Sequence, residues 1–316
     1  MNGAHTITAT SARTRRWWLG LGVGLILVVA VAWRVHPLAV LRQAIAADPA
    51  LFMAALAAYL ASQGASALRL AMLARGAGYA VPLERVVQIH AAGAFFGLVA
   101  PTTLGNDACR VLYLGRETPN VARAVSVVLF DRLQGLVVLG AVGAVAALLV
   151  VTVVLPPGVA RAVGAFGTTA VLGGVLVVGG ARWVRPEHPI RRALGDAIRA
   201  PRLLAATSVV SAVIVGLQIA SQALLASSIG VHVPLAHVAV YHPLVVLGGT
   251  LPITFAGLGT REATYLWMLG PAGVAAESAL AWSVLWLAVG ILNGLVGGLI
   301  VLASRMPSPG TRAGVA

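Results

Sequence analysis

The sequence predicts an all-α integral membrane protein with about six transmembrane helices and two re-entrant half-helix elements in an inverted repeat. Three observations support this fold class: an apolar composition, six long apolar segments, and two broken apolar segments that resemble each other. Hydrophobic residues make up 59% of the 316 residues and charged residues 10%, against roughly 25% charged residues in a soluble domain. A water-soluble fold is excluded, and we expect one membrane domain over residues 1–316.

Six apolar segments are long enough to cross a bilayer, which takes about 20 helical residues. They are Trp17 to Val35, Ala50 to Leu73, Val121 to Leu155, Ala162 to Ala181, Leu203 to Ile229 and Ala275 to Ala303. The first segment follows three arginines but lacks a small-x-small cleavage site followed by soluble sequence. We therefore expect it to be a retained span rather than a signal peptide.

Two further apolar segments are broken. The stretch from Val86 to Ala100 ends at Pro101, and the stretch from Leu244 to Leu258 is interrupted by Pro252 and several glycines. Irregular backbone at membrane depth persists only where protein or a water-filled cavity satisfies its polar groups. Both segments are therefore predicted to be re-entrant half-helices.

The arginines predict the topology. All 22 basic side chains are Arg, and an N-terminus in the cytoplasm places sixteen of them on cytoplasmic segments, six of these between Arg182 and Arg202. The positive-inside rule therefore predicts that both termini lie in the cytoplasm, and we expect the membrane to be the inner membrane of a bacterium. Because the arginines stand at the ends of apolar runs and not beside aromatics in a soluble module, no nucleic-acid partner is expected.

The two broken segments share a motif. In both, Gly stands four residues before Pro101 or Pro252, Thr two residues after it, and Arg nine residues after it, at Arg110 and Arg261. Three predicted spans separate the two segments, so they would enter the membrane from opposite sides. Inverted repeats with broken helices are typical of transporters, and the repeat halves are predicted at roughly 17–155 and 162–303.

Arg110 and Arg261 are the main candidate binding residues. Each follows a helix break, where free backbone N–H groups and a guanidinium can together hold an anion such as a phosphate. The alternative is that each Arg extends to the membrane surface or pairs locally with Asp107 or Glu262. The matched spacing favours a shared headgroup site.

Polar residues inside the predicted spans are further candidates. Asp131 and Arg132 lie well inside the third span, where charges are costly and normally face a cavity or a partner, although a purely structural ion pair is the alternative. Gln63 belongs to a polar stripe with Ser66 and Arg69, and Gln222 to a second stripe on the fifth span. Such stripes line a polar path or serve as hydrogen bonds between helices.

No motif indicates covalent catalysis or nucleotide binding. The single cysteine and the scattered histidines show no spacing that suits a metal site. We therefore expect a protein that is not an enzyme and that uses neither a metal nor a cofactor.

With these motifs, the chain resembles the lysylphosphatidylglycerol synthase transmembrane (flippase-like) family. The resemblance rests on three motifs whose residues are Pro101, Gly105 and Arg110, then Asp131 and Arg132, then Pro252, Gly257, Gly259 and Glu262. Asp131 replaces the family's usual Glu, and Ala256 replaces the first of two adjacent glycines. The second change restricts backbone approach to a ligand.

The resemblance implies a lipid transporter. In the best-known members, a soluble aminoacyltransferase domain is fused to this membrane domain, which moves the lipid product between leaflets. The chain ends at Ala316 directly after its last predicted span, so the flippase-like part alone is expected. The substrate implied is a phospholipid, an aminoacyl-phospholipid or a polyprenyl or glycolipid.

Two other functions stay open from the sequence. A membrane-embedded glycosyl- or acyltransferase would need a carboxylate or histidine cluster at an aqueous face. A non-catalytic partner of a separate lipid-modifying enzyme would recruit it through the loop from Arg182 to Arg202, although this loop equally suits topology and contact with anionic headgroups.

Overall fold

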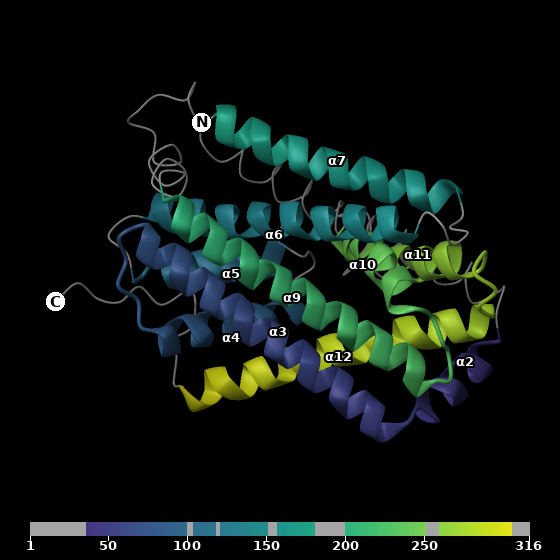
Figure 1. The fold of residues 1–316 in the computed structure, drawn as a ribbon. Coiled ribbons are helices and arrows are strands. Elements are labelled where there is room, and N and C mark those ends of the chain that lie inside the picture. Colours follow the sequence, from purple (N-terminus) through teal and green to yellow (C-terminus); the bar gives the residue numbers. More distant parts are fainter. Residues whose placement is uncertain are drawn as a thin grey trace, which may run out of the picture.

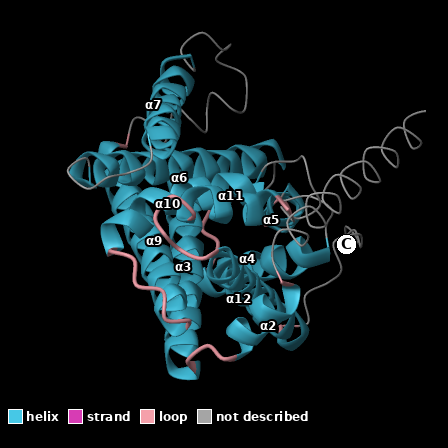
Figure 2. Ribbon diagram, turned by 90° about the vertical axis from the view of Figure 1, so that its right-hand side faces the viewer, coloured by secondary structure: helices cyan, strands magenta, loops and turns pink. Residues whose placement is uncertain are grey.

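The computed structural model describes residues 36–99, 104–117, 121–150, 157–180, 200–250 and 259–304. Across these ranges the chain forms helices and no strands (Figures 1 and 2). The helices are α2 (Pro37–Ile45), α3 (Pro49–Gly76), α4 (Leu83–Val99), α5 (Leu104–Leu114), α6 (Val121–Val150), α7 (Pro157–Gly180), α9 (Pro201–Ser228), α10 (Leu235–Thr250), α11 (Thr260–Leu269) and α12 (Ala276–Ala303). The prediction of an all-α protein is confirmed.

Four of these helices, α3, α6, α9 and α12, are long and apolar enough to cross a membrane. Each has at least 28 residues, or roughly 42 Å at 1.5 Å per residue, against a hydrocarbon thickness of about 30 Å. They correspond to four of the six predicted spans.

The other two predicted spans have different outcomes. Residues 17–35 lie outside the described residues. The segment from Ala162 to Ala181 falls almost entirely on the α7 helix, which is not among the four candidate spans of the described part of the chain. The α7 helix contacts α6 and lies at the edge of the molecule (Figure 2).

Helices α3 and α9 form an antiparallel pair at the centre of the fold (Figure 1). The backbone N–H of Asp48 donates to the carbonyl of Ser228 at 2.8 Å, and the hydroxyl of Ser221 donates to the carbonyl of Ala55 at 2.8 Å. Asp48 also caps α3, because its carboxylate accepts from the first two N–H groups after Pro49. The start of α3 is thereby fixed to the end of α9.

Helices α4 and α5 form a hairpin. Arg85 at the start of α4 pairs with Glu117 just after α5 at 2.6 Å, so both open ends of the hairpin lie on the same side. Gly93 lies against Asn106 so closely that a Cβ atom at position 93 would be 2.4 Å from the Asn106 side-chain oxygen. The joint between the two helices, with Pro101, lies outside the described residues.

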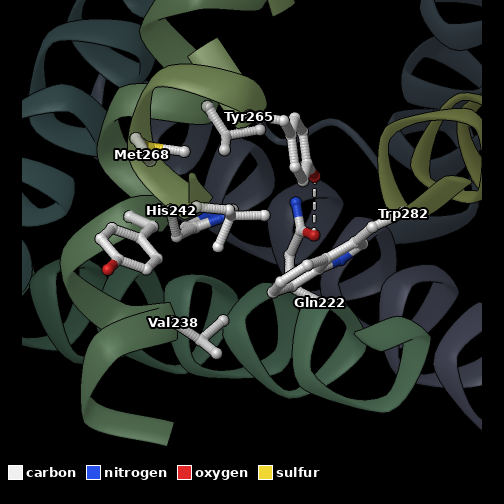
Figure 3. Close-up of a pocket in the computed structure, with 9 residues that line it drawn as sticks. Gln222, Val238, His242, Tyr265, Met268 and Trp282 are labelled. Carbon is white, nitrogen blue, oxygen red and sulfur yellow. Dashed lines mark hydrogen bonds between the residues drawn. The ribbon is translucent and has the colours of Figure 1, made fainter. Parts of the chain in front are cut away.

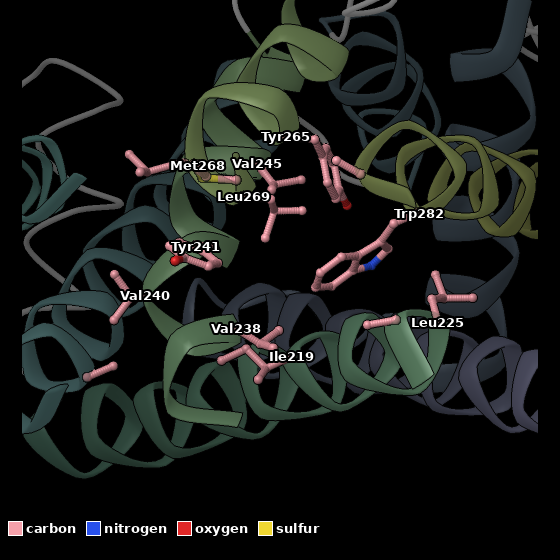
Figure 4. Packing of buried hydrophobic residues seen from close by; sticks show 14 of the residues in the cluster. Ile219, Leu225, Val238, Val240, Tyr241, Val245, Tyr265, Met268, Leu269 and Trp282 are labelled. Atoms are coloured by element: carbon pink, nitrogen blue, oxygen red, sulfur yellow. The ribbon is translucent and has the colours of Figure 1, made fainter. Parts of the chain in front are cut away.

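Helices α10 and α11 form a second hairpin, located toward the opposite end of the α3–α9 pair (Figure 1). Tyr241 of α10 lies beside Met268 near the end of α11, and Val238 of α10 lies beside Ile219 of α9 (Figure 4). The joint, which contains Pro252 and Gly257, also lies outside the described residues.

Each hairpin packs in a core of its own and against a long helix of the other half. One core joins α4 and α5 to α3 and α6, and the other joins α10 and α11 to α9 and α12 (Figure 4). In addition, α4 packs against Gly294, Gly297 and Gly298 of α12. Likewise, Pro243 of α10 packs against Gly143 of α6. Glycines allow this close approach of helices, as in other membrane proteins.

Candidate functional site

Asp131 is the centre of a buried polar cluster. It lies on α6 with 3% of its surface exposed. Its carboxylate accepts a hydrogen bond from Nε of Arg69 at 2.7 Å and lies 3.9 Å from a guanidinium nitrogen of Arg110. Arg69 also donates to the hydroxyl of Ser211 at 2.9 Å. Helices α3, α5 and α6 therefore meet at one carboxylate, and Arg69 links this carboxylate to α9.

His90 and Gln63 extend this cluster toward α4. The Nε2 atom of His90 lies 3.0 Å from the Gln63 side-chain oxygen and 3.3 Å from a guanidinium nitrogen of Arg110. His90 is 4% exposed, and the Arg110 side chain is 12% exposed. We call Gln63, Arg69, His90, Arg110 and Asp131 the first-half cluster.

The first-half cluster has more positive than negative charge. Arg69 and Arg110 are cationic and only Asp131 is anionic, because neutral His90 and Gln63 add no charge. A buried cation without a full counter-charge is costly at membrane depth and marks a functional site. Within the part of the chain that the structure describes, the cluster thus carries one excess positive charge that an anion can balance.

Arg132 does not pair with Asp131, its neighbour in the sequence. Consecutive helical residues point in different directions, and Arg132 instead forms an ion pair with Asp107 on α5. The Arg132 side chain is 35% exposed. This pair is neutral and joins α5 to α6 beside the first-half cluster.

The corresponding arginine of the second half has its own counter-ion. Arg261 on α11 is 7% exposed and donates to Glu262 at 2.5 Å and to Ser283 on α12 at 3.2 Å. The other carboxylate oxygen of Glu262 accepts from the N–H of Gly259 at 2.7 Å and so caps α11. Gly259 has φ of 86°, a conformation that favours glycine. We call Arg261, Glu262 and Ser283 the second-half cluster, and it is neutral.

Gln222 belongs to neither cluster. Its side-chain oxygen accepts from the hydroxyl of Tyr265 at 2.8 Å, beside a pocket that also contains His242 and Trp282 (Figure 3). The pocket has a volume of about 10 Å³, at the lower limit for one water molecule. Gln222 therefore connects α9 to α11 and does not border a space for a ligand there.

A larger cavity lies between α3, α4 and α12. Its volume is about 200 Å³. Gln63, His90 and Asn293 are its polar lining residues, and the rest of its wall is apolar or glycine. The first-half cluster thus reaches this cavity through Gln63 and His90.

The structure brings only some of the predicted site residues together. Gln63, Arg110 and Asp131 lie in the first-half cluster, Asp107 pairs with Arg132, and Arg261 pairs with Glu262. Arg110 and Arg261 have separate partners within the described part of the chain. Gly105 lies in the first turn of α5 and Gly259 caps α11, whereas Pro101, Pro252 and Gly257 lie outside the described residues.

Sequence analysis missed three of the residues found here. Arg69 stood out only as part of a polar stripe, although a charge inside an apolar span is itself a functional signal. His90 was weighed only as a metal ligand, and Asn293 carried no signal. Two polar side chains, Gln88 and His90, interrupt the otherwise apolar stretch of α4 and could have indicated His90.

Comparison with known proteins gives a family but no characterised relative. No curated protein matches the chain. The family model described as lysylphosphatidylglycerol synthase TM region matches residues 17–298, which is most of the chain. Together with its apolar helices, this match identifies a multi-pass membrane protein. The chain belongs to the lysylphosphatidylglycerol synthase TM region family.

Proposed function

We propose that this protein is a transporter that moves an anionic, phosphate-bearing lipid between the leaflets of the bacterial inner membrane, with both of its termini in the cytoplasm. The observation that carries the proposal is the excess positive charge of the first-half cluster. A soluble anion would have to reach Arg69 and Arg110 through apolar helices. A lipid can bring its headgroup to this depth while its chains stay in the bilayer.

The packing of the hairpins supports an inverted repeat. Each half consists of a long helix, a hairpin and a second long helix, α3 to α6 and α9 to α12. The α4–α5 hairpin contacts α12, the last helix of the other half, and α10 contacts α6 in the corresponding way. A two-fold relation with hairpins at opposite ends suits alternating access to a site between the halves. We interpret the hairpins as re-entrant elements beside six spans.

The partners of Asp131 favour transport over transferase chemistry. A glycosyl- or acyltransferase needs a carboxylate or histidine that can reach its substrate. The Asp131 carboxylate is 3% exposed and is approached by two guanidinium groups, those of Arg69 and Arg110. Its role is to hold Arg69 and Arg110 in place, so we propose a protein that is not an enzyme.

A leaflet-resolved comparison of lipids tests the function. Cells that lack the protein would be complemented with the wild type, with Arg110→Gln or with Arg85→Gln, and the lipids of each leaflet would be measured. Arg85 is the control because its ion pair with Glu117 is partly exposed at the open end of the hairpin.

We expect one anionic lipid class to change its leaflet distribution in cells that lack the protein. Wild type and Arg85→Gln should restore the distribution, and Arg110→Gln should not. Identical distributions in all four strains, at equal protein levels in the complemented ones, would show that the protein does not move lipids.

A further inference from the structure

We infer that Asp107 is an internal competitor of the lipid phosphate. The phosphate displaces the Asp107 carboxylate from Arg132 and is then held between Arg132 and Arg110. This inference rests on the proposed function and names the residues that receive its headgroup. Three observations carry it: the exposure of the Asp107–Arg132 ion pair, its position beside Arg110, and the long distance between Arg110 and the nearest carboxylate.

The Asp107–Arg132 pair is partly exposed although Arg132 lies well along a helix that is long and apolar enough to cross the membrane. The side chains of Arg132 and Asp107 are 35% and 17% exposed. Arg132 lies roughly 16 Å from the start of α6 at Val121, at 1.5 Å per residue. Charges inside such helices face a polar cavity or a partner rather than acyl chains, and they mark substrate pathways. The exposed side of the pair is therefore where a headgroup can arrive.

Exposure falls steadily from this pair to the first-half cluster. Asp107 precedes Arg110 by one helical turn on α5, and Arg132 directly follows Asp131 on α6. The exposed fractions of the side chains are 35% for Arg132, 17% for Asp107, 12% for Arg110, 8% for Arg69 and 5% for Asp131. A headgroup that moves inward between α5 and α6 thus meets the Asp107–Arg132 pair before it meets Arg110.

A carboxylate and a phosphodiester are alternative partners for the same guanidinium. Each carries one negative charge on oxygen atoms that accept hydrogen bonds from arginine. The Asp107 carboxylate accepts from Arg132, and it also attracts Arg110, which Arg132 repels. This carboxylate therefore lies in the field of two cations on neighbouring helices, as an anion bound by both of them would.

Arg110 can form a further bond to such an anion. Among the described residues, its nearest carboxylate oxygen belongs to Asp131 and lies 3.9 Å from a guanidinium nitrogen, beyond hydrogen-bond distance. Asp131 instead accepts from Arg69 at 2.7 Å. A phosphate oxygen can supply the charge-assisted hydrogen bond that Asp131 does not give to Arg110.

The competition also determines which headgroups bind and how they leave. A headgroup without a negative charge offers Arg132 a weaker partner than Asp107 does, so it does not displace the carboxylate. A phosphodiester brings one negative charge, which balances the single excess charge of the first-half cluster. When the lipid leaves, the Asp107 carboxylate returns to Arg132, and no unpaired charge remains there.

Asp107→Asn tests the inference through a gain of affinity, which a loss of folding cannot produce. The matched control is Glu117→Gln, which also removes one carboxylate from a partly exposed ion pair, in this case with Arg85 at the open end of the hairpin. Arg132→Gln removes the cation for which Asp107 and the phosphate compete. The double variant of Asp107→Asn and Arg132→Gln completes a double-mutant cycle.

Binding would be measured by titrating fluorescent phosphatidylglycerol into nanodiscs of phosphatidylcholine that contain the purified protein. We expect Asp107→Asn to lower Kd about threefold or more, because the competing ion pair is lost. Arg132→Gln should raise Kd about tenfold or more, because a charge-assisted contact is lost, and Glu117→Gln should leave Kd unchanged. In the double variant most of the gain from Asp107→Asn should disappear, because Asp107 acts mainly through Arg132.

Three results would overturn the inference. The first is a Kd in Asp107→Asn that is equal to or higher than that of the wild type. The second is an equal gain of affinity in Glu117→Gln, which would reveal a general effect of net charge. The third is displacement of the probe by inorganic phosphate as readily as by unlabelled phosphatidylglycerol, which would assign the arginines to a soluble anion.

The binding and leaflet experiments fail independently. Lipid redistribution by the wild type combined with an unchanged Kd in Asp107→Asn would leave the proposed function intact and reduce Asp107 to a link between α5 and α6. Tighter binding in Asp107→Asn without any redistribution in cells would keep the binding site and refute transport.

Discussion

In the first half of the protein, Arg110 shares the carboxylate of Asp131 with Arg69, whereas in the second half Arg261 has the carboxylate of Glu262 beside it. The residues of the following long helix that face the two repeat-matched arginines differ. Asp131 on α6 faces Arg110, and Ser283 on α12 faces Arg261. By the spacing of the repeat, Trp282 takes the position of Asp131, one residue before Ser283.

The two halves therefore share a backbone arrangement but differ in how their charges are paired. In the second half, the carboxylate has moved to Glu262, where it also caps α11. In the first half, one carboxylate serves two arginines and leaves an excess positive charge. We therefore expect the first-half cluster to bind an anion and the second-half cluster to stabilise the α11 hairpin.

The largest expected effect is on stability and comes from Asp131→Asn. The change leaves Arg69 and Arg110 without a carboxylate in a buried cluster, which should cost about 3–5 kcal/mol. Glu262→Gln leaves only one arginine uncompensated and should cost less. Thermal unfolding of both purified variants in detergent measures the difference, and equal or reversed losses would contradict the proposed charge count.

The second prediction separates binding from stability. Arg110→Gln leaves Arg69 and Asp131 as a neutral pair, so the fold should persist while the affinity for anionic lipid falls by about 10- to 150-fold, the equivalent of about 1.5–3 kcal/mol. Arg261→Gln should instead destabilise the protein, because Glu262 stays buried without its cation. Lipid titration and thermal unfolding of both variants check this contrast.

The same pair of variants decides between separate sites and the shared headgroup site predicted from the sequence. If both arginines contact one anion, Arg261→Gln should weaken binding as strongly as Arg110→Gln. Binding of nearly wild-type strength in Arg261→Gln would favour separate roles for the two halves.

The third prediction concerns the packing of the two hairpins. By the spacing of the repeat, Gly93 in α4 corresponds to Leu244 in α10. A Cβ atom at Gly93 would lie 2.4 Å from the side-chain oxygen and 3.2 Å from the backbone oxygen of Asn106. Gly93→Ala should therefore separate α4 from α5 and cost about 1–3 kcal/mol.

Gly64→Ala is the control for this change, because a Cβ atom there meets nothing within 4 Å. Its helix propensity should even improve stability by up to about 1 kcal/mol. Thermal unfolding of the two variants measures both effects. If Gly93→Ala were as stable as Gly64→Ala, the close contact between α4 and α5 would not exist in solution.

The sequence predicted the helices more completely than the partners of their side chains. Apolar length and composition are local properties, and they located α3, α6, α9 and α12 to within a few residues. The positions of Pro101 and Pro252 placed breaks between α4 and α5 and between α10 and α11. These features need no knowledge of what lies across the fold.

Partners of charged residues could not be predicted in the same way. Asp131 and Arg132 are adjacent in the sequence, but their contacts lie on different helices, with Arg69 and Asp107 respectively. Only the antiparallel packing of α3 with α9 and the position of α6 bring Arg69, Asp131 and Ser211 together. Local pairing was correct for Arg261 and Glu262, where capping of α11 holds the carboxylate in place.

The last prediction concerns the two serines that contact the arginines, and it includes the smallest expected loss of stability. Ser211→Ala removes the hydroxyl that accepts from a terminal guanidinium nitrogen of Arg69, and a buried charged donor that loses its acceptor costs about 1–3 kcal/mol. Ser283→Ala removes an acceptor from Nε of Arg261 and a donor to Oε1 of Glu262, but Nε keeps Glu262 at 3.1 Å and Glu262 keeps Arg261 and the N–H of Gly259. Because every charged atom keeps a partner, that loss should be only about 0.5–1 kcal/mol. Thermal unfolding of both variants under identical conditions tests the order. A larger loss of stability for Ser283→Ala would show that the second-half cluster depends on α12 as strongly as the first-half cluster depends on α9. The contrast in charge balance between the two halves would then lose its structural basis.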